Sequence, residues 1–139
     1  MLIAVNAGNS RVLLGGYEED GQVFSASIAT EPKLTRDDYA CKLQQVLLLY
    51  GVNVRRIHGG IVSSVVPSMV GVLEGALRLL GIRDVIEVSS GVKTGLNIRS
   101  EQPRQVGSDR VAAAVAARAK GKLPCVAITL GTATTFTAL

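Results

Sequence analysis

Two short turns, one near each end of the chain, combine glycine with hydroxyl and amide side chains. Gly8-Asn9-Ser10 follows one apolar run, and Gly131-Thr132-Ala133-Thr134 follows another. Backbone N–H groups and hydroxyls in such turns bind anionic oxygens, although a glycine turn in a hairpin usually only reverses the chain. Because the pattern occurs twice, we interpret the two turns as contacts to the phosphate groups of a nucleotide, made from both sides.

A third candidate site stands where a helix is expected to begin. Gly107-Ser108-Asp109-Arg110 ends the irregular stretch 89–107, which has no clear periodicity and is long for a loop in a compact domain. A carboxylate beside a guanidinium, at a helix start after an irregular loop, suits a small anionic acyl substrate. The alternative is that Asp109 is a plain helix N-cap and Arg110 a solvated neighbour.

The elements that position these residues follow from the hydrophobic pattern. Strands are expected at 2–6, 11–17, 22–29, 57–66, 85–88 and 126–130, with another beginning after the second turn. Helices are expected from the N-cap Thr35 to Gly51, over 69–80, and from Asp109 to Gly121. The third helix should bury a face of small residues, namely Val111, Ala112, Val115, Ala116 and Ala119.

The order of these elements predicts an α/β fold. Three strands followed by helix, strand, helix, strand, loop, helix and strand indicate an RNase H-like domain with a mixed sheet flanked by helices. We assign residues 1–120 to this domain and 121–139 to the first strand and phosphate-type turn of an incomplete second domain. We expect strand 126–130 to lack a partner strand within the chain, which is an aggregation liability, so another chain or a second copy should cover it.

Composition excludes several classes of protein. The 139 residues are 47% hydrophobic and 19% charged, with few aromatics, which fits one core of aliphatic side chains and excludes disorder. The net charge of +4 is scattered, so we expect no nucleic acid as partner. We find no signal peptide and no membrane-spanning run. Cys41 and Cys125 are far apart, and we expect two reduced core cysteines in a cytoplasmic protein.

Several motifs in one order resemble type III pantothenate kinase, a family of the acetate/sugar kinase–Hsp70–actin superfamily. The resemblance covers essentially all of this chain and about the first half of a typical family member. The motifs are Gly8-Asn9-Ser10, Ser63-Ser64-Val65-Val66-Pro67, Gly91-Val92-Lys93-Thr94-Gly95-Leu96, Pro103-Arg104, Gly107-Ser108-Asp109-Arg110 and Gly131-Thr132-Ala133-Thr134-Thr135-Phe136.

The resemblance implies two RNase H-like domains with ATP bound in the cleft between them. It implies phosphate contacts at both glycine turns and a pantothenate site at Gly107, Ser108 and Arg110, with Asp109 as the base for the substrate hydroxyl. The family enzymes are dimers with the site at the subunit interface. They require Mg²⁺ and a monovalent cation, K⁺ or NH4⁺.

The sequence departs from the family pattern on the metal side. Asn6, Thr129 and Thr137 stand where the family has aspartates, and Ser100 stands where it usually has a tyrosine near the substrate. An Asn6 carbonyl can still coordinate Mg²⁺, but it supplies no countercharge. Three neutral replacements at corresponding positions indicate a site that no longer uses Mg·ATP for phosphoryl transfer.

Three hypotheses follow. The first is a subunit of a pantothenate kinase-like phosphotransferase that makes 4'-phosphopantothenate for coenzyme A biosynthesis. Its partner would be a family paralogue or a separately encoded second half. The second is an inactive regulatory or binding paralogue, similar to the Bvg accessory factor. The third is a fragment of a longer protein, although truncation alone would not replace the aspartates.

Overall fold

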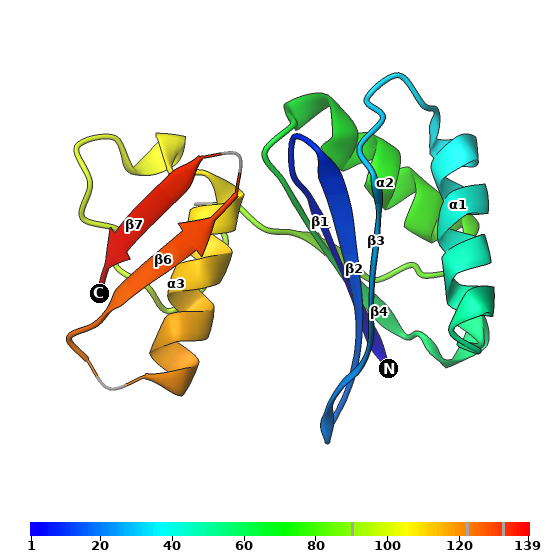
Figure 1. The fold of residues 1–139 in the computed structure, drawn as a ribbon, viewed down its shortest axis with the longest axis horizontal. Coiled ribbons are helices and arrows are strands. Elements are labelled where there is room, and N and C mark those ends of the chain that lie inside the picture. The colour runs from blue at the N-terminus through cyan, green and yellow to red at the C-terminus, as the bar shows by residue number, and fades with distance from the viewer. Residues whose placement is uncertain (90, 122, 132) are drawn as a thin grey trace. The chain divides into compact units, whose positions relative to one another are not determined.

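The computed structural model describes residues 1–89, 91–121, 123–131 and 133–139, so Ser90, Lys122 and Thr132 lie outside the described part. The chain divides into two compact units, Met1–Glu87 (unit 1) and Val88–Leu139 (unit 2) (Figure 1). Each unit has its own sheet and its own helix or helices. The sequence-based boundary at residue 120 concerns the domains of a completed protein and stays a prediction.

Unit 1 contains a five-stranded mixed sheet. Its strands are β1 (Leu2–Ala7), β2 (Arg11–Glu18), β3 (Gly21–Ala29), β4 (Gly59–Ser64) and β5 (Val85–Glu87). β2 pairs antiparallel with β1 and β3, while β4 lies parallel to both β1 and β5. The resulting order, β3-β2-β1-β4-β5, with these strand directions, is that of an RNase H-like domain, so the predicted fold class is confirmed.

Two helices of unit 1, α1 (Arg36–Leu49) and α2 (Pro67–Leu79), pack against each other on one side of the sheet (Figure 1). Between α1 and β4 the chain forms a short 3₁₀ turn, η1 (Val54–Arg56). The buried helix residues recur every three or four positions, as expected for helices with one apolar face. They are Tyr39, Ala40, Leu43 and Leu47 on α1, and Met69, Leu73, Ala76 and Leu77 on α2.

Local sequence signals set the ends of both helices. Thr35 is the N-cap of α1, and its hydroxyl accepts a hydrogen bond of 3.2 Å from the backbone N–H of Asp38. The Asp38 carboxylate in turn accepts one of 2.9 Å from the N–H of Thr35, which confirms the predicted capping box. Gly51 follows α1 at a φ of 67°, and Pro67 occupies the first turn of α2.

The helices cover one face of the unit 1 sheet. On β1, Ile3, Val5 and Ala7 are buried, whereas Leu2 on the opposite face is 51% exposed. The register places Leu13, Ile61 and Ile86 on that same opposite face, and they are also exposed.

Unit 2 consists of a helix packed against a two-stranded antiparallel sheet (Figure 1). After the irregular stretch and a 3₁₀ turn, η2 (Pro103–Gln105), come α3 (Ser108–Lys120), β6 (Val126–Leu130) and β7 (Thr134–Ala138). Backbone hydrogen bonds between Cys125 and Leu139, 2.8 and 3.0 Å long, close the open end of the β6–β7 hairpin.

Several sequence-based expectations were wrong. Strand 126–130 has a partner, because it pairs with Thr134–Ala138. The strand predicted at 57–66 is limited to Gly59–Ser64, since a 3₁₀ turn precedes it and α2 follows it. Cys41 is exposed and Cys125 half-buried, so neither belongs to the core, although both are free as expected.

The buried face of α3 also differs from the prediction. Val111 and Ala114 are the buried residues, whereas Ala112, Ala116 and Ala119 are exposed. A helix composed largely of alanine has little contrast between its faces, so the position of the hairpin decides which face is covered. None of the described helices is both long enough and apolar enough to cross a membrane.

Candidate functional site

The first glycine turn connects β1 and β2 in unit 1. The N–H of Gly8 donates to the carbonyl of Arg11 at 2.9 Å, and Thr30 donates to the carbonyls of Gly8 and Ser10 at 2.8 and 3.0 Å. The turn is therefore tied to the end of β3, and the Gly8 N–H is not available to a phosphate. The side chains of Asn9 and Ser10 are exposed and remain free to face a ligand.

The second glycine turn connects β6 and β7 in unit 2. Here too the glycine N–H is used inside the turn, because Gly131 donates to the carbonyl of Ala133 at 3.2 Å. Thr134 is exposed and begins β7 opposite Leu130, while the predicted contact Thr132 lies outside the described residues. In both turns the glycine N–H therefore forms a hydrogen bond within the turn, and among the described residues the side chains of Asn9, Ser10 and Thr134 are exposed.

The predicted metal position, Asn6, lies on β1 between Leu13 of β2 and Ser63 of β4. Its Oδ1 is buried and has no hydrogen-bond partner among the described residues. One neutral oxygen is a poor ligand for Mg²⁺, which prefers carboxylates. The described residues contain no group of three or more His, Cys, Asp or Glu side chains able to hold a metal ion. The described residues around Asn6 therefore do not by themselves provide the carboxylate ligands that a divalent cation prefers.

Thr129 and Thr137, the other two neutral residues at positions where the family resemblance predicts aspartates, lie on the β6–β7 hairpin. Both are half-buried on the hairpin face that packs against α3. Neither side chain carries a negative charge, so Thr137 supplies no carboxylate at the position where the family resemblance predicts a monovalent cation.

The Gly107–Arg110 motif forms the start of α3. Gly107 is the N-cap, and its carbonyl accepts hydrogen bonds of 3.1 Å from the N–H groups of Arg110 and Val111. The proposal that Asp109 caps the helix was wrong, because Asp109 lies within the first turn, where a negative charge favours the helix dipole. A Cβ on Gly107 would lie 2.6 Å from Asp109 Oδ1, so a larger residue at position 107 would require the Asp109 carboxylate to move.

A cavity of about 570 Å³ lies in unit 2 beside this motif. Three arginines line it, Arg99, Arg110 and Arg118, and the described lining residues include no Asp or Glu side chain. The rest of the lining is largely apolar, contributed by Leu96, Ile98, Val106, Val111, Ala114 and Leu123. Such a lining suits a small molecule that has one anionic end and an aliphatic body.

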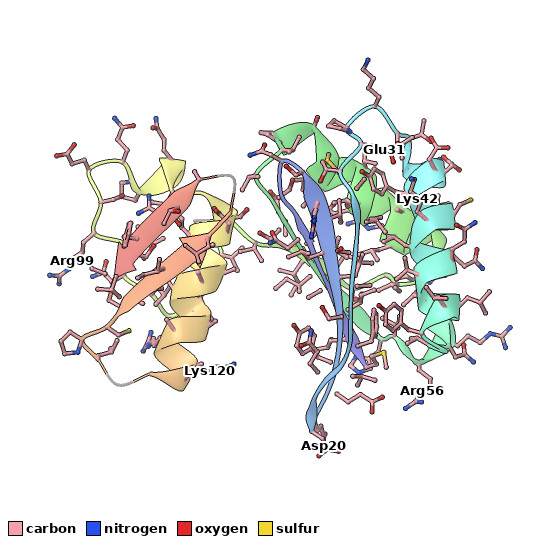
Figure 2. All side chains as sticks on the ribbon, viewed as in Figure 1. Asp20, Glu31, Lys42, Arg56, Arg99 and Lys120 are labelled. Carbon is pink, nitrogen blue, oxygen red and sulfur yellow. The ribbon has the colours of Figure 1, made fainter. Side chains whose placement is uncertain are left out.

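Arg110 is the predicted site residue that reaches this cavity. Its Nη2 donates to the carbonyl of Phe136 on β7 at 3.4 Å, whereas its Nε is buried without a partner among the described residues. Arg118 donates through Nη1 to the carbonyl of Gly95 and so joins α3 to the irregular stretch. Arg99 lies at the outer edge of that stretch (Figure 2).

The structure brings some of the predicted residues together. Gly107–Arg110 and the turn at Gly131 both belong to unit 2. Helix α3 packs against β6 and runs in the opposite direction, so the start of α3 lies near the end of β6, where the turn follows (Figure 1). Asn6 and the first turn belong to unit 1. Sequence reasoning missed Arg118, although residues 110, 114 and 118 are four apart and therefore share one helix face.

Unit 1 contains a second cavity, of about 580 Å³, at the C-terminal end of α1. Its lining is uncharged and includes Gln44, Leu48 and Asn53. No predicted site residue lines it, so the cavity beside Arg110 is the better candidate for a substrate site.

A family model and three curated relatives all match this chain under the same family description. A sequence model of type III pantothenate kinase matches residues 2–139. Three curated relatives are named type III pantothenate kinase. The protein of Syntrophotalea carbinolica is 40% identical, and those of Geobacter sulfurreducens and Geotalea daltonii are each 36% identical, all over 98% of this chain. The chain spans about half the length of these relatives, 53% of each.

A crystal structure of a candidate N-acetylglucosamine kinase from Porphyromonas gingivalis also overlaps the chain. The TM-score is 0.49 at 16% identity, over 68% of this chain and 37% of that one. This overlap is too weak to assign a fold, which rests here on the strand order of unit 1.

Proposed function

Because the chain belongs to the type III pantothenate kinase family, we propose that it is one subunit of an ATP-dependent phosphotransferase that converts pantothenate to 4'-phosphopantothenate. In this proposal the chain supplies the substrate-side residues. A second protein chain, either a family paralogue or a separately encoded second half, completes the site. In the completed assembly, residues 1–120 form the first domain and residues 121–139 begin the second.

The observation that carries the proposal is the cavity beside Arg110. Its volume of about 570 Å³, three arginines and aliphatic lining match a small carboxylate with an alkyl body, which is the chemistry of pantothenate. The buried Nε of Arg110, which has no partner among the described residues, is a donor left for the substrate carboxylate. Ser100 also lines this cavity, and a serine leaves more space there than the tyrosine that the family usually has.

The proposed reaction uses Asp109 as the general base. Asp109 is next to Arg110 in the first turn of α3 but does not line the cavity, so the substrate hydroxyl would have to extend beyond the cavity to reach it. The Asp109 carboxylate takes the proton of the substrate hydroxyl as the hydroxyl oxygen forms a bond to the terminal phosphorus and the bond to the leaving phosphate breaks. A residue larger than Gly107 would require this carboxylate to move, and Ser108 begins the same helix turn. ATP supplies the phosphoryl group when bound. Each unit has exposed side chains suited to phosphate oxygens, Asn9 and Ser10 in unit 1 and Thr134 in unit 2.

In this proposal the partner chain supplies the carboxylates that bind the metal ion. Phosphoryl transfer requires countercharge for the phosphates, and this chain has Asn6, Thr129 and Thr137 where the family has aspartates. The same replacements favour the second candidate function, a non-catalytic regulatory paralogue that binds a ligand or a partner without turnover.

The test is purification of the tagged chain with its natural partner, followed by an assay of ATP-dependent pantothenate phosphorylation. Asp109→Asn should lower kcat of the complex by roughly 10²-fold or more, because loss of a general base costs 10²–10⁴-fold. Asp20→Asn, the same substitution in the exposed turn after β2, is the matched control and should leave kcat unchanged.

Two results would contradict the proposal. Full activity of the isolated chain would show that no partner is needed. A complex that binds pantothenate but never phosphorylates it would favour the regulatory function.

A further inference from the structure

The cavity beside Arg110 extends along α3 in the direction away from Asp109. Its helix residues, Arg110, Val111, Ala114 and Arg118, all follow Asp109, which does not line the cavity. Arg110 and Arg118 are eight residues apart, a rise of about 12 Å along an α-helix. The proposed reaction takes place at the first turn of α3, so it leaves the far part of the cavity without an assigned ligand group.

A guanidinium group lines each end of this helix face. Arg110 donates to the carbonyl of Phe136, and its Nε has no partner among the described residues. Arg118 donates through Nη1 to the carbonyl of Gly95, which uses one of its five N–H groups. In the part of the chain that the structure describes, neither arginine forms an ion pair with a carboxylate. Both arginines therefore have donors left for an anionic ligand.

Positive charge is concentrated in the unit that contains this cavity. Residues 88–139 include seven Lys and Arg but two Asp and Glu, so unit 2 carries a net charge of +5, whereas unit 1 carries −1. A carboxylate alone supplies one negative charge against the three arginines of the cavity. A carboxylate together with a phosphate monoester supplies about 2.5 to 3, because the second pKa of a phosphate is about 6.

The remaining lining determines what joins the two anionic groups. It is largely aliphatic, with Leu96, Ile98 and Ala114 between the arginines in the lining set. The described lining residues include no aromatic side chain on which a nucleotide base could stack. An aliphatic body therefore suits this cavity better than a nucleotide does.

We propose that this cavity also binds a regulatory ligand, an aliphatic molecule with a carboxylate at one end and a phosphate monoester at the other. The carboxylate binds Arg110, as in the proposed function, on which this inference rests, and the phosphate binds Arg118. A molecule in this orientation extends away from Asp109, so it is not phosphorylated. It occupies the pantothenate site and inhibits the reaction, and Arg118 is the residue that selects it over pantothenate.

The experiment compares two probes, pantothenate and 4'-phosphopantothenate, which differ by one terminal phosphate. Isothermal titration calorimetry of the 139-residue chain, with EDTA and without ATP, measures binding in the absence of turnover. The phosphorylated probe should bind about fivefold or more tightly, because its phosphate gains charge-assisted hydrogen bonds to Arg118. The gain is limited to this order because Arg118 is exposed and solvent weakens the attraction.

Matched variants test the role of Arg118. Arg118→Gln should reduce the difference between the probes to within about twofold and leave the affinity for pantothenate nearly unchanged. Arg118→Met, which keeps the aliphatic stem without the charge, should do the same and replaces Arg118→Gln if that variant fails to fold. Lys120→Gln removes the same charge at the end of α3 (Figure 2) and should preserve the difference, because Lys120 does not line the cavity.

A further variant separates charge from structure. Arg118 also joins α3 to the irregular stretch through the Gly95 carbonyl, so its loss could change the cavity wall. Arg118→Lys keeps the positive charge and should retain most of the preference for the phosphorylated probe. If Arg118→Lys loses the preference completely, the contact to Gly95 rather than the charge matters, and the proposal is wrong.

Three other results would overturn the proposal. The first is equal affinity of the unaltered chain for the two probes, and the second is an equal effect of Arg118→Gln and Lys120→Gln. The third is a difference between the probes that changes in Asp109→Asn but not in Arg118→Gln, because the phosphate would then lie at the start of α3, as expected for a reaction product. Since turnover is not measured, the preference can persist in a chain that fails as a kinase, and equal affinities would leave the kinase proposal intact.

Discussion

At the scale of single residues, the tightest steric constraint in unit 1 is at Gly16 of β2. A Cβ at this position would lie 2.5 Å from Cδ1 of Phe24, whose ring is buried and lies 5.3 Å from the ring of Tyr50. The β2–β3 register also shifts between Gly16 and Tyr17. Glycine at this position therefore allows the aromatic ring to lie directly against the strand.

Gly16→Ala should destabilise the chain by roughly 1–3 kcal/mol, because overpacking forces the Phe24 ring or the backbone to move. Gly71→Ala is the matched control. A Cβ there meets nothing within 4 Å, and alanine in the interior of α2 should stabilise by roughly 0.5–1 kcal/mol. Urea unfolding of the two variants measures both changes, and effects of the same sign would contradict the steric explanation.

At the scale of elements, the start of α1 depends on one pair of side chains. The backbone N–H and the hydroxyl of Thr35 both donate hydrogen bonds to the Asp38 carboxylate. These bonds, of which the backbone one has the larger effect, hold the pKa of Asp38 below its usual value of 3.8. Replacement of Thr35 by alanine removes the N-cap acceptor and should cost roughly 1 kcal/mol in the free energy of unfolding.

The same pair predicts a dependence on pH. Because the pKa of Asp38 is lower in the folded chain, its contribution to stability is fully present above about pH 4 and is lost as the pH falls through the folded value. Asp38→Asn should therefore reduce the loss of folding stability as the pH falls. Asp37→Asn, at the neighbouring position without the cap hydrogen bond, should leave that pH dependence unchanged. Equal curves for the two variants, measured by thermal unfolding between about pH 2 and 6, would contradict this.

At the scale of the whole molecule, the chain should behave as a protein without a divalent metal site of its own. The described residues include no group of three or more His, Cys, Asp or Glu side chains that could hold a metal ion, so we expect Mg²⁺ to bind the folded and unfolded chain about equally. The Tm of the chain should change by less than about 1 °C between excess EDTA and a few millimolar Mg²⁺. A shift of several degrees would show that Asn6 and its neighbours still bind the metal.

The fold was largely predictable from the sequence because its signals are local. The Thr35 capping box, the glycine at 51 and the apolar run of β1 each arise from interactions within a few residues, and the structure confirms the capped helix start, the left-handed glycine and the strand. The order of strands and helices then restricts the topology to one RNase H-like arrangement. The motif series also indicated the family that the sequence comparison gives.

The candidate site was less predictable, because it depends on segments far apart in the chain. The cavity combines Arg99 from the irregular stretch, Arg118 from the far end of α3 and residues 137–139. Similarly, the Gly8 and Gly131 N–H groups look free in the sequence, but turn geometry uses them within their own turns.

The sequence by itself determined the order of strands, helices and turns and their approximate positions, since propensity, capping and periodicity act between near neighbours. Only the tertiary structure decided which face of α3 is buried and that the β6–β7 hairpin turns its threonines inward and its apolar side outward. The physical reason is that an alternating strand has two possible faces, and only the layers packed against it determine which one is buried.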